Sequence, residues 1–214
     1  MTRVKVCGVT AAADLRAVDD VGADAVGVIT DVPVETPREV TPDHAAELVA
    51  AASPFLTTAL VLMPESPDHA VDLADVVRPD VLQLHADFDA DELRFVRAES
   101  GASVVPVVDA DDPERARAYD DVADAIVVDS TSDDGAGGTG ETHDWTATRD
   151  LAAALSTPVV LAGGLTPANV AEAVETVAPY AVDVASGVES TGGRKDHEAV
   201  EAFVRNARRR EVTA

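Results

Sequence analysis

Short apolar segments alternate with longer amphipathic segments along the whole chain. The apolar segments are rich in Val, Ile and Leu and show no alternation with polar positions. Such runs are typical of strands that are covered on both faces, as in a parallel sheet. Eight strands are predicted, at residues 3–6, 25–29, 57–62, 81–84, 103–107, 125–128, 158–161 and 181–184.

The segments between the strands are Ala-rich and carry apolar residues at helical spacing. Eight helices are predicted, at residues 11–21, 42–51, 67–77, 90–99, 113–119, 145–155, 167–177 and 196–208. Four of them have a capping side chain directly before a proline at the first helical position, a common helix start. These pairs are Thr41-Pro42, Ser66-Pro67, Asp112-Pro113 and Thr166-Pro167.

Eight strand–helix units in 214 residues predict an α/β protein with a single (β/α)8 TIM-barrel domain over residues 1–214. The alternative is a doubly wound open sheet, which usually has fewer strands. No Gly-x-Gly-x-x-Gly sequence follows the first strand, so the pattern gives no support for dinucleotide binding.

The composition is strongly acidic. Forty Asp and Glu residues against sixteen Lys and Arg give a net charge of −24, and Lys5 and Lys195 are the only lysines. Such a chain should repel nucleic acids and anionic membranes, whose binding needs basic residues. Excess acid, scarce lysine and a core of Ala and Val, with only 3% aromatic residues, are typical of proteins from extreme halophiles.

The sequence also bears on the cellular compartment. No run of about 18 apolar residues is present, so a membrane span is not expected. The first residues enter a strand-like run and show no signal-peptide pattern. A single cysteine cannot form an internal disulfide, and the expected location is the cytoplasm.

In a TIM barrel the active site lies where the strands end, and candidate side chains occur there. Cys7 follows the first strand, and it is either a reactive thiol or a small buried residue. Arg38, in the loop after the second strand, could bind an anion or form a surface ion pair. His85, after the fourth strand, could bind substrate or satisfy a backbone group. Asp129 ends an apolar strand, which favours acid–base or ligand chemistry over a capping role.

Two glycine-containing loops follow the last two strands. Gly163 and Gly164 come after the seventh strand, and Ser186 and Gly187 come after the eighth. Paired loops at these strands typically bind phosphate through backbone N–H groups. A further Gly-rich loop is predicted at residues 133–140. The five histidines show no metal-ligand spacing, so no metal is expected.

Several motifs, in order along nearly the whole chain, resemble those of the phosphoribosylanthranilate isomerase family. The most specific are Lys-x-Cys-Gly-x-Thr at residues 5–10 and Val-Asp-x-x-Ser-Gly-Val-Glu at residues 182–189. Others are Gln-Leu-His at 83–85, Val-Asp-Ser at 128–130, Gly-Gly-Leu at 163–165 and Lys-Asp-His at 195–197. One departure is residues 28–34, which lack the aromatic residues common there in the family.

The resemblance implies an Amadori rearrangement in tryptophan biosynthesis. N-(5-phosphoribosyl)anthranilate would become 1-(o-carboxyphenylamino)-1-deoxyribulose 5-phosphate without a cofactor. By the family pattern, Asp129 would be the general acid and Cys7 the general base. Arg38 would hold the anthranilate carboxylate, and the loops at Gly163-Gly164 and Ser186-Gly187 would hold the phosphate.

Two further residues complete the expected substrate site, His85 and Asp183. Asp183 could also pair with Lys5 inside the barrel, and a structural role is the preferred interpretation for Lys5. Two alternatives stay open, another sugar-phosphate isomerase, epimerase or lyase, and a non-catalytic barrel that binds a phosphorylated ligand. The expected partner is a small phosphorylated substrate, and the expected assembly is a monomer or a homodimer.

Overall fold

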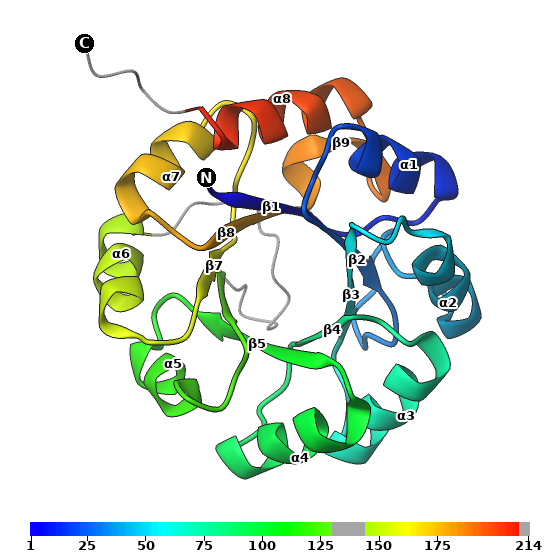
Figure 1. The fold of residues 1–214 in the computed structure, drawn as a ribbon, viewed down its shortest axis with the longest axis vertical. Coiled ribbons are helices and arrows are strands. Elements are labelled where there is room, and N and C mark those ends of the chain that lie inside the picture. The colour runs from blue at the N-terminus through cyan, green and yellow to red at the C-terminus, as the bar shows by residue number, and fades with distance from the viewer. Residues whose placement is uncertain (130–143, 210–214) are drawn as a thin grey trace.

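The strands follow one another around a closed parallel barrel in chain order (Figure 1). The computed structural model describes residues 1–129 and 144–209. Its barrel strands are β1 (Arg3–Val6), β2 (Ala25–Ile29), β3 (Thr57–Leu62), β4 (Val81–Leu84), β5 (Ser103–Asp109), β6 (Ile126–Asp129), β7 (Val159–Leu161) and β8 (Ala181–Val184). The first strand pairs with the last in parallel, from Arg3 opposite Ala181 to Val6 opposite Val184. The predicted (β/α)8 barrel is therefore confirmed.

Helices form the outer ring around the strands (Figure 1). They are α1 (Ala12–Asp20), α2 (Pro42–Ala51), α3 (Pro67–Val77), α4 (Ala90–Ser100), α5 (Pro113–Tyr119), α6 (Trp145–Ala154), α7 (Val170–Val177) and α8 (His197–Ala207). Three predicted starts are confirmed, because Thr41, Ser66 and Asp112 each accept a hydrogen bond from the backbone N–H three residues later.

The predicted start of α7 at Pro167 is wrong by three residues. The side chain of Thr166 accepts a hydrogen bond from the N–H of Ala168, and its own N–H donates to Oδ1 of Asn169. Local bonds of this kind compete with the helix. They hold a turn before Val170, where the helix begins.

Alternate residues of each strand face opposite sides of the barrel wall. One set packs under the helices in the main core, for example Val4, Val6 and Leu82. The other set faces the barrel interior, where small side chains such as Val127 and Ala181 pack together. Among the described residues, the interior face also carries buried polar side chains, which include Lys5 on β1, Gln83 on β4, Asp129 on β6 and Asp183 on β8.

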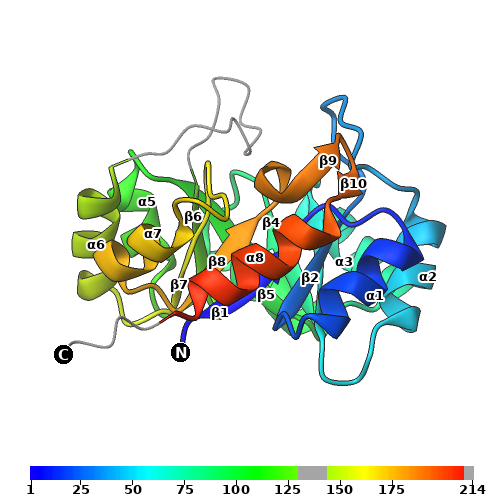
Figure 2. The same ribbon diagram turned by 90° about the horizontal axis from the view of Figure 1, so that it is seen from above.

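A short hairpin after β8 was not predicted. A 3-10 turn at Ser186–Val188 leads into β9 (Glu189–Thr191), which pairs antiparallel with β10 (Arg194–Lys195). Figure 2 shows this hairpin beside the loop between β2 and α2, at one end of the barrel. The predicted Gly-rich loop at residues 133–140 lies outside the described residues.

Candidate active site

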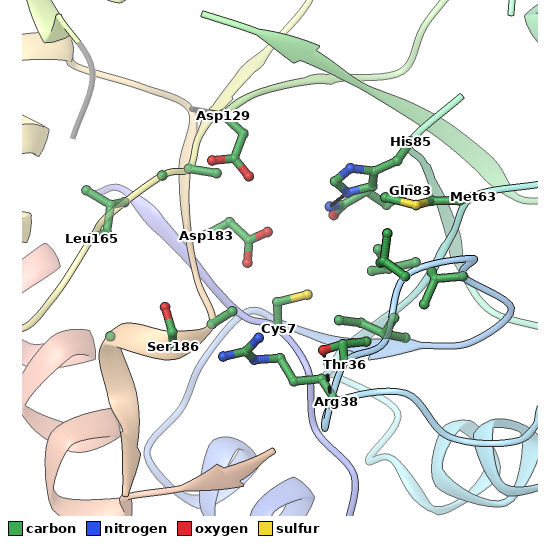
Figure 3. Close-up of a pocket in the computed structure, with 18 of the residues that line it drawn as sticks. Cys7, Thr36, Arg38, Met63, Gln83, His85, Asp129, Leu165, Asp183 and Ser186 are labelled. Carbon is green, nitrogen blue, oxygen red and sulfur yellow. Dashed lines mark hydrogen bonds between the residues drawn. The ribbon is translucent and has the colours of Figure 1, made fainter. Parts of the chain in front are cut away.

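One cavity at the carboxyl ends of the barrel strands brings together every predicted site residue (Figure 3). These are the two proposed acid–base groups, three polar side chains and the residues of two loops. They are Cys7, Asp129, Arg38, His85, Asp183, Gly163, Gly164, Ser186 and Gly187. The sequence therefore predicts correctly that these residues meet, while their individual roles stay predictions.

Cys7 directly follows Val6, the last residue of β1. Its backbone N–H donates to the carbonyl of Val184 at 2.8 Å, which continues the pairing of β1 with β8. Its side chain shares the interior face with Lys5, as the alternation along the strand requires. Only 6% of Cys7 is exposed, and this burial raises the pKa of its thiol, with the Lys5 ammonium as the main opposing influence.

Lys5 and Asp183 form an ion pair beneath Cys7, as the sequence suggested. The Lys5 Nζ lies 2.7 Å from Oδ2 of Asp183. The second oxygen of Asp183, Oδ1, is buried and has no hydrogen-bond partner among the residues that the structure describes. Burial lowers the pKa of Lys5, but the charges of Asp183 and Cys7 more than offset it, so the pKa is raised. Lys5 therefore carries a full positive charge at neutral pH.

Asp129 is the last residue of β6 and is 8% exposed. The strands β7 and β8 separate it from β1 in the barrel order. In Figure 3 its carboxylate and the Cys7 sulfur both point into the cavity, with Asp183 between them. A carboxyl group and a thiol thus face the same space from different strands, an arrangement suited to moving protons at two positions of one ligand.

Arg38 lines the cavity and also forms an ion pair with Glu189. Its Nε and Nη2 donate to the two carboxylate oxygens of Glu189 at 2.9 and 2.8 Å. Lys195 donates to the same carboxylate at 2.8 Å and to the carbonyl of Ala185 at 3.1 Å. The two cations outnumber the one carboxylate, so this cluster keeps a net positive charge at the cavity edge in a chain that is otherwise strongly acidic.

The loops after β7 and β8 approach each other closely. A Cβ atom on Gly187 would lie 1.9 Å from the carbonyl oxygen of Leu165, so no side chain fits there. Asn169 supports the first loop by donating to the carbonyl of Gly164 at 2.9 Å. The glycine loops therefore bring two stretches of backbone to one side of the cavity.

Comparison with known proteins then decides the family. The sequence model for N-(5'phosphoribosyl)anthranilate (PRA) isomerase matches residues 4–206. The chain belongs to this family. An N-(5'-phosphoribosyl)anthranilate isomerase from the haloarchaeon Haloferax volcanii is 68% identical over 97% of this chain and 94% of its own length.

Solved structures agree with the PRA isomerase assignment. The phosphoribosylanthranilate isomerase of Thermotoga maritima has a TM-score of 0.85 and 34% identity, and the match covers 97% of this chain and 98% of that one. A phosphoribosylanthranilate isomerase in complex with reduced 1-(o-carboxyphenylamino)-1-deoxyribulose 5-phosphate has a TM-score of 0.81 and 32% identity, with 97% and 98% coverage. The match to the family model therefore confirms the predicted isomerase. The high identity to a haloarchaeal relative confirms the predicted halophilic type of sequence.

His85 lies in the PRA isomerase cavity as a neutral ring. Burial, reinforced by the charge of Lys5, lowers the pKa of His85 to about 4. Its Nε2 lies 3.5 Å from Nε2 of Gln83. At neutral pH it can donate or accept one hydrogen bond but cannot supply positive charge.

The wall of the cavity near β2 and β3 is aliphatic rather than aromatic. It is built from Ile29, Val32, Val34, Val61 and Met63. This agrees with the sequence departure noted above, since no aromatic residue of residues 28–34 is available. A flat apolar group can still pack against these side chains, because apolar burial does not require an aromatic partner.

Sequence reasoning missed two residues that shape the PRA isomerase site, Glu189 and Lys195. Both appeared only as parts of motifs, with no role assigned. The available signal was the scarcity of lysine: a lysine retained where arginine replaces nearly every other base is a candidate for a buried position. Lys195 is indeed buried, with its side chain fully covered.

The described residues also bear on metals and membranes. Within residues 1–129 and 144–209, no group of three or more His, Cys, Asp or Glu side chains is arranged to hold a metal ion. None of the helices in those ranges combines the length and hydrophobicity needed to cross a membrane.

Proposed function

We propose that this cavity carries out the isomerisation of N-(5-phosphoribosyl)anthranilate to 1-(o-carboxyphenylamino)-1-deoxyribulose 5-phosphate, with Asp129 as general acid and Cys7 as general base. The observation that carries the proposal is the convergence of these two groups on one cavity that has a cationic edge and a glycine-loop edge. The ligand bound to the related isomerase is a reduced form of this product.

The reaction needs two proton transfers at different places on the sugar. Asp129 donates a proton to the ring oxygen while the bond from that oxygen to C1 breaks, which leaves an open-chain Schiff base. Cys7, as a thiolate, removes the proton from C2, and the electron pair of that bond forms the enolamine. Tautomerisation gives the ketone, so all atoms of the substrate are retained. Each group of this kind contributes roughly 10²–10⁴-fold to the rate.

The two charged ends of the substrate match the two edges of the cavity. Arg38 uses Nε and Nη2 on Glu189, and its remaining Nη1 would meet the anthranilate carboxylate. The loops at Gly163-Gly164 and Ser186-Gly187 would hold the phosphate through backbone N–H groups. The aliphatic wall would cover the anthranilate ring, while His85 and Asp183 would contact the sugar.

The experiment follows the decay of anthranilate-type fluorescence in molar KCl, with substrate generated in situ. We expect fast decay for the wild type and at least about a hundredfold slower decay for Cys7→Ala and for Asp129→Ala, because each loses one acid–base group. Asp75→Ala, which changes an exposed carboxylate on α3, should react like the wild type.

A Cys7 or Asp129 variant that keeps at least half of the wild-type rate would remove that residue from its role. Folded wild-type protein that shows no decay would instead favour the phosphate-binding barrel without catalysis. The expectations of a cytoplasmic location and of a monomer or homodimer stay predictions. A solved Thermotoga maritima structure concerns monomers generated from a dimeric phosphoribosylanthranilate isomerase.

A further inference from the structure

We propose that Lys5 is a positioning residue for the general base: its ammonium stabilises the Cys7 thiolate, and Asp183 sets how much of that positive charge reaches the sulfur. This inference rests on the proposed function, because Lys5 is assigned a role that acts through Cys7. It replaces the purely structural interpretation of Lys5 that the sequence favoured.

The first support is geometric. Lys5 and Cys7 are two positions apart on β1 and face the barrel interior together. A Cβ atom built on Gly27 of the neighbouring strand β2 would lie 2.7 Å from the Cys7 sulfur and 3.0 Å from the Lys5 Nζ. The sulfur and the ammonium therefore converge over the bare backbone of Gly27. They come within the roughly 4–6 Å at which an opposite charge strongly favours an ionised group.

The second support is the set of charges around Cys7. From β1 it faces Lys5, from β8 it faces Asp183, and from β10 it faces Lys195. Lys5 is the strongest of the influences that lower the pKa of Cys7, Asp183 acts in the opposite sense, and Lys195 contributes less than either. The other charged or titratable groups that line the cavity are Asp129, Arg38 and His85. His85 stays neutral, and Arg38 is held by Glu189.

The third support is the sharing of one ammonium between two acids. Lys5 holds Oδ2 of Asp183 at 2.7 Å, and both side chains are about nine-tenths buried. A buried thiol without a nearby cation would remain protonated, because burial disfavours the thiolate. The negative charge of Asp183 partly cancels the positive charge of Lys5, so Lys5 stabilises the Cys7 thiolate less than it would alone. Removing Lys5 and neutralising Asp183 must therefore affect the thiol in opposite directions.

The chain offers a direct measurement, since Cys7 is its one cysteine. The rate of alkylation by iodoacetamide as a function of pH reports the ionisation of this thiol alone, because the thiolate is the nucleophile. No activity is needed for this readout. The wild type is compared with Lys5→Met, Asp183→Asn and the double variant, all in molar KCl.

We expect the pH midpoint for alkylation to rise in Lys5→Met and to fall in Asp183→Asn. Below the wild-type midpoint, alkylation should be about tenfold slower in the first and about tenfold faster in the second, which corresponds to about one pKa unit each way. The double variant should lie between the two single variants. Lys5→Arg, which keeps the charge, should stay closer to the wild type than Lys5→Met does.

Arg205→Met, which changes an exposed side chain on α8, is the control and should leave the midpoint unchanged. Circular dichroism establishes that each variant is folded. Should Lys5→Met fail to fold because Asp183 is left buried without its partner, Asp183→Asn alone still decides, since its midpoint must fall. A midpoint that does not move in Asp183→Asn, or single variants that shift in the same direction, would overturn the proposal.

The pH dependence of kcat provides a second readout. The base must be deprotonated, so the activity should rise with pH, and in Lys5→Met this rise should move to higher pH. A role confined to stability would lower Tm without moving the profile. Activity retained in Cys7→Ala would overturn the proposed function itself. Loss of activity in Cys7→Ala, together with an alkylation midpoint that does not move in Lys5→Met or Asp183→Asn, would overturn only the role of Lys5.

Discussion

At the scale of single residues, the barrel interior is polar where the chemistry is proposed. Lys5, Gln83 and Asp183 are buried among otherwise aliphatic strands. A buried charge is tolerated only when it is paired and hydrogen-bonded, and Lys5 and Asp183 satisfy this requirement for each other. Oδ1 of Asp183 is one of the buried side-chain atoms without a hydrogen-bond partner among the described residues, and under the proposed function a substrate hydroxyl would complete it.

Gly27 gives a prediction at this scale. In Gly27→Ala the new Cβ would lie 2.7 Å from the Cys7 sulfur, closer than such atoms pack, so the thiol must move. We expect kcat to fall at least about tenfold with a smaller change in KM, since a displaced base loses general-base catalysis. Steady-state kinetics measures both constants.

Gly27→Ser, with a larger side chain, should lower kcat further than Gly27→Ala. A normal kcat in Gly27→Ala would show that the cavity accommodates the methyl group and that the position of the sulfur is not tightly constrained. Thermal unfolding of both variants separates a displaced thiol from general loss of structure.

At the scale of elements, the hairpin of β9 and β10 connects two edges of the cavity. Lys195 on β10 reaches Glu189 on β9 and, through it, Arg38 in the loop after β2. The same ammonium holds the carbonyl of Ala185, directly before the proposed phosphate loop. One buried lysine therefore helps to hold both Arg38, which would bind the carboxylate, and the loop that would bind the phosphate.

Lys195→Met should weaken substrate binding more than it slows the chemical step. We expect KM to rise about tenfold and kcat to change only a few-fold, because a lost interaction with a charged group is worth roughly 1.5–3 kcal/mol. Arg194→Met changes the exposed neighbour on the same strand and should leave KM unchanged. A KM as low as that of the wild type in Lys195→Met would show that the two edges are held without this lysine.

The sequence predicts the barrel elements well because their signals are local. Apolar runs mark the strands, and a capping side chain before proline marks three helix starts that the structure confirms. The hairpin of β9 and β10 was not predicted because its residues are mostly polar and exposed. Its stability comes from long-range contacts of Glu189 and Lys195. The start of α7 was wrong because Thr166 and Asn169 form side-chain bonds that favour a turn.

The site was predictable to the extent that barrel geometry collects strand ends in one place. Cys7 and Asp129 could be located from their positions after apolar strands. The sequence also suggested the pairing of Lys5 with Asp183. It could not reveal that Arg38 is held by Glu189, because that contact joins positions far apart in the chain.

At the scale of the whole molecule, the net charge of −24 creates strong self-repulsion. Several exposed carboxylates have arginine partners, as in the pair of Arg94 with Asp91, but forty acids face only sixteen bases. In molar salt the Debye length is about 3 Å, so the repulsion is screened. In dilute buffer it acts across the surface and disfavours the compact state.

Stability should therefore depend on salt. We expect the fluorescence of Trp145, which packs partly buried against the core, to report unfolding as KCl falls from molar levels to about 0.05 M, outside the screened regime. Activity should fall over the same range. Fluorescence that is unchanged down to that concentration would contradict a salt requirement, and restoring KCl tests whether the loss is reversible.

Closure of the barrel between β1 and β8 has a consequence for folding during synthesis on the ribosome. Lys5 must wait for Asp183, which is synthesised 178 positions later, and Cys7 likewise waits for the backbone of Val184. Until then β1 offers an unpaired edge and a buried-type lysine without its counter-charge. Completion of the sheet and assembly of the site are thus one late event, and a nascent chain that stops before β8 has neither.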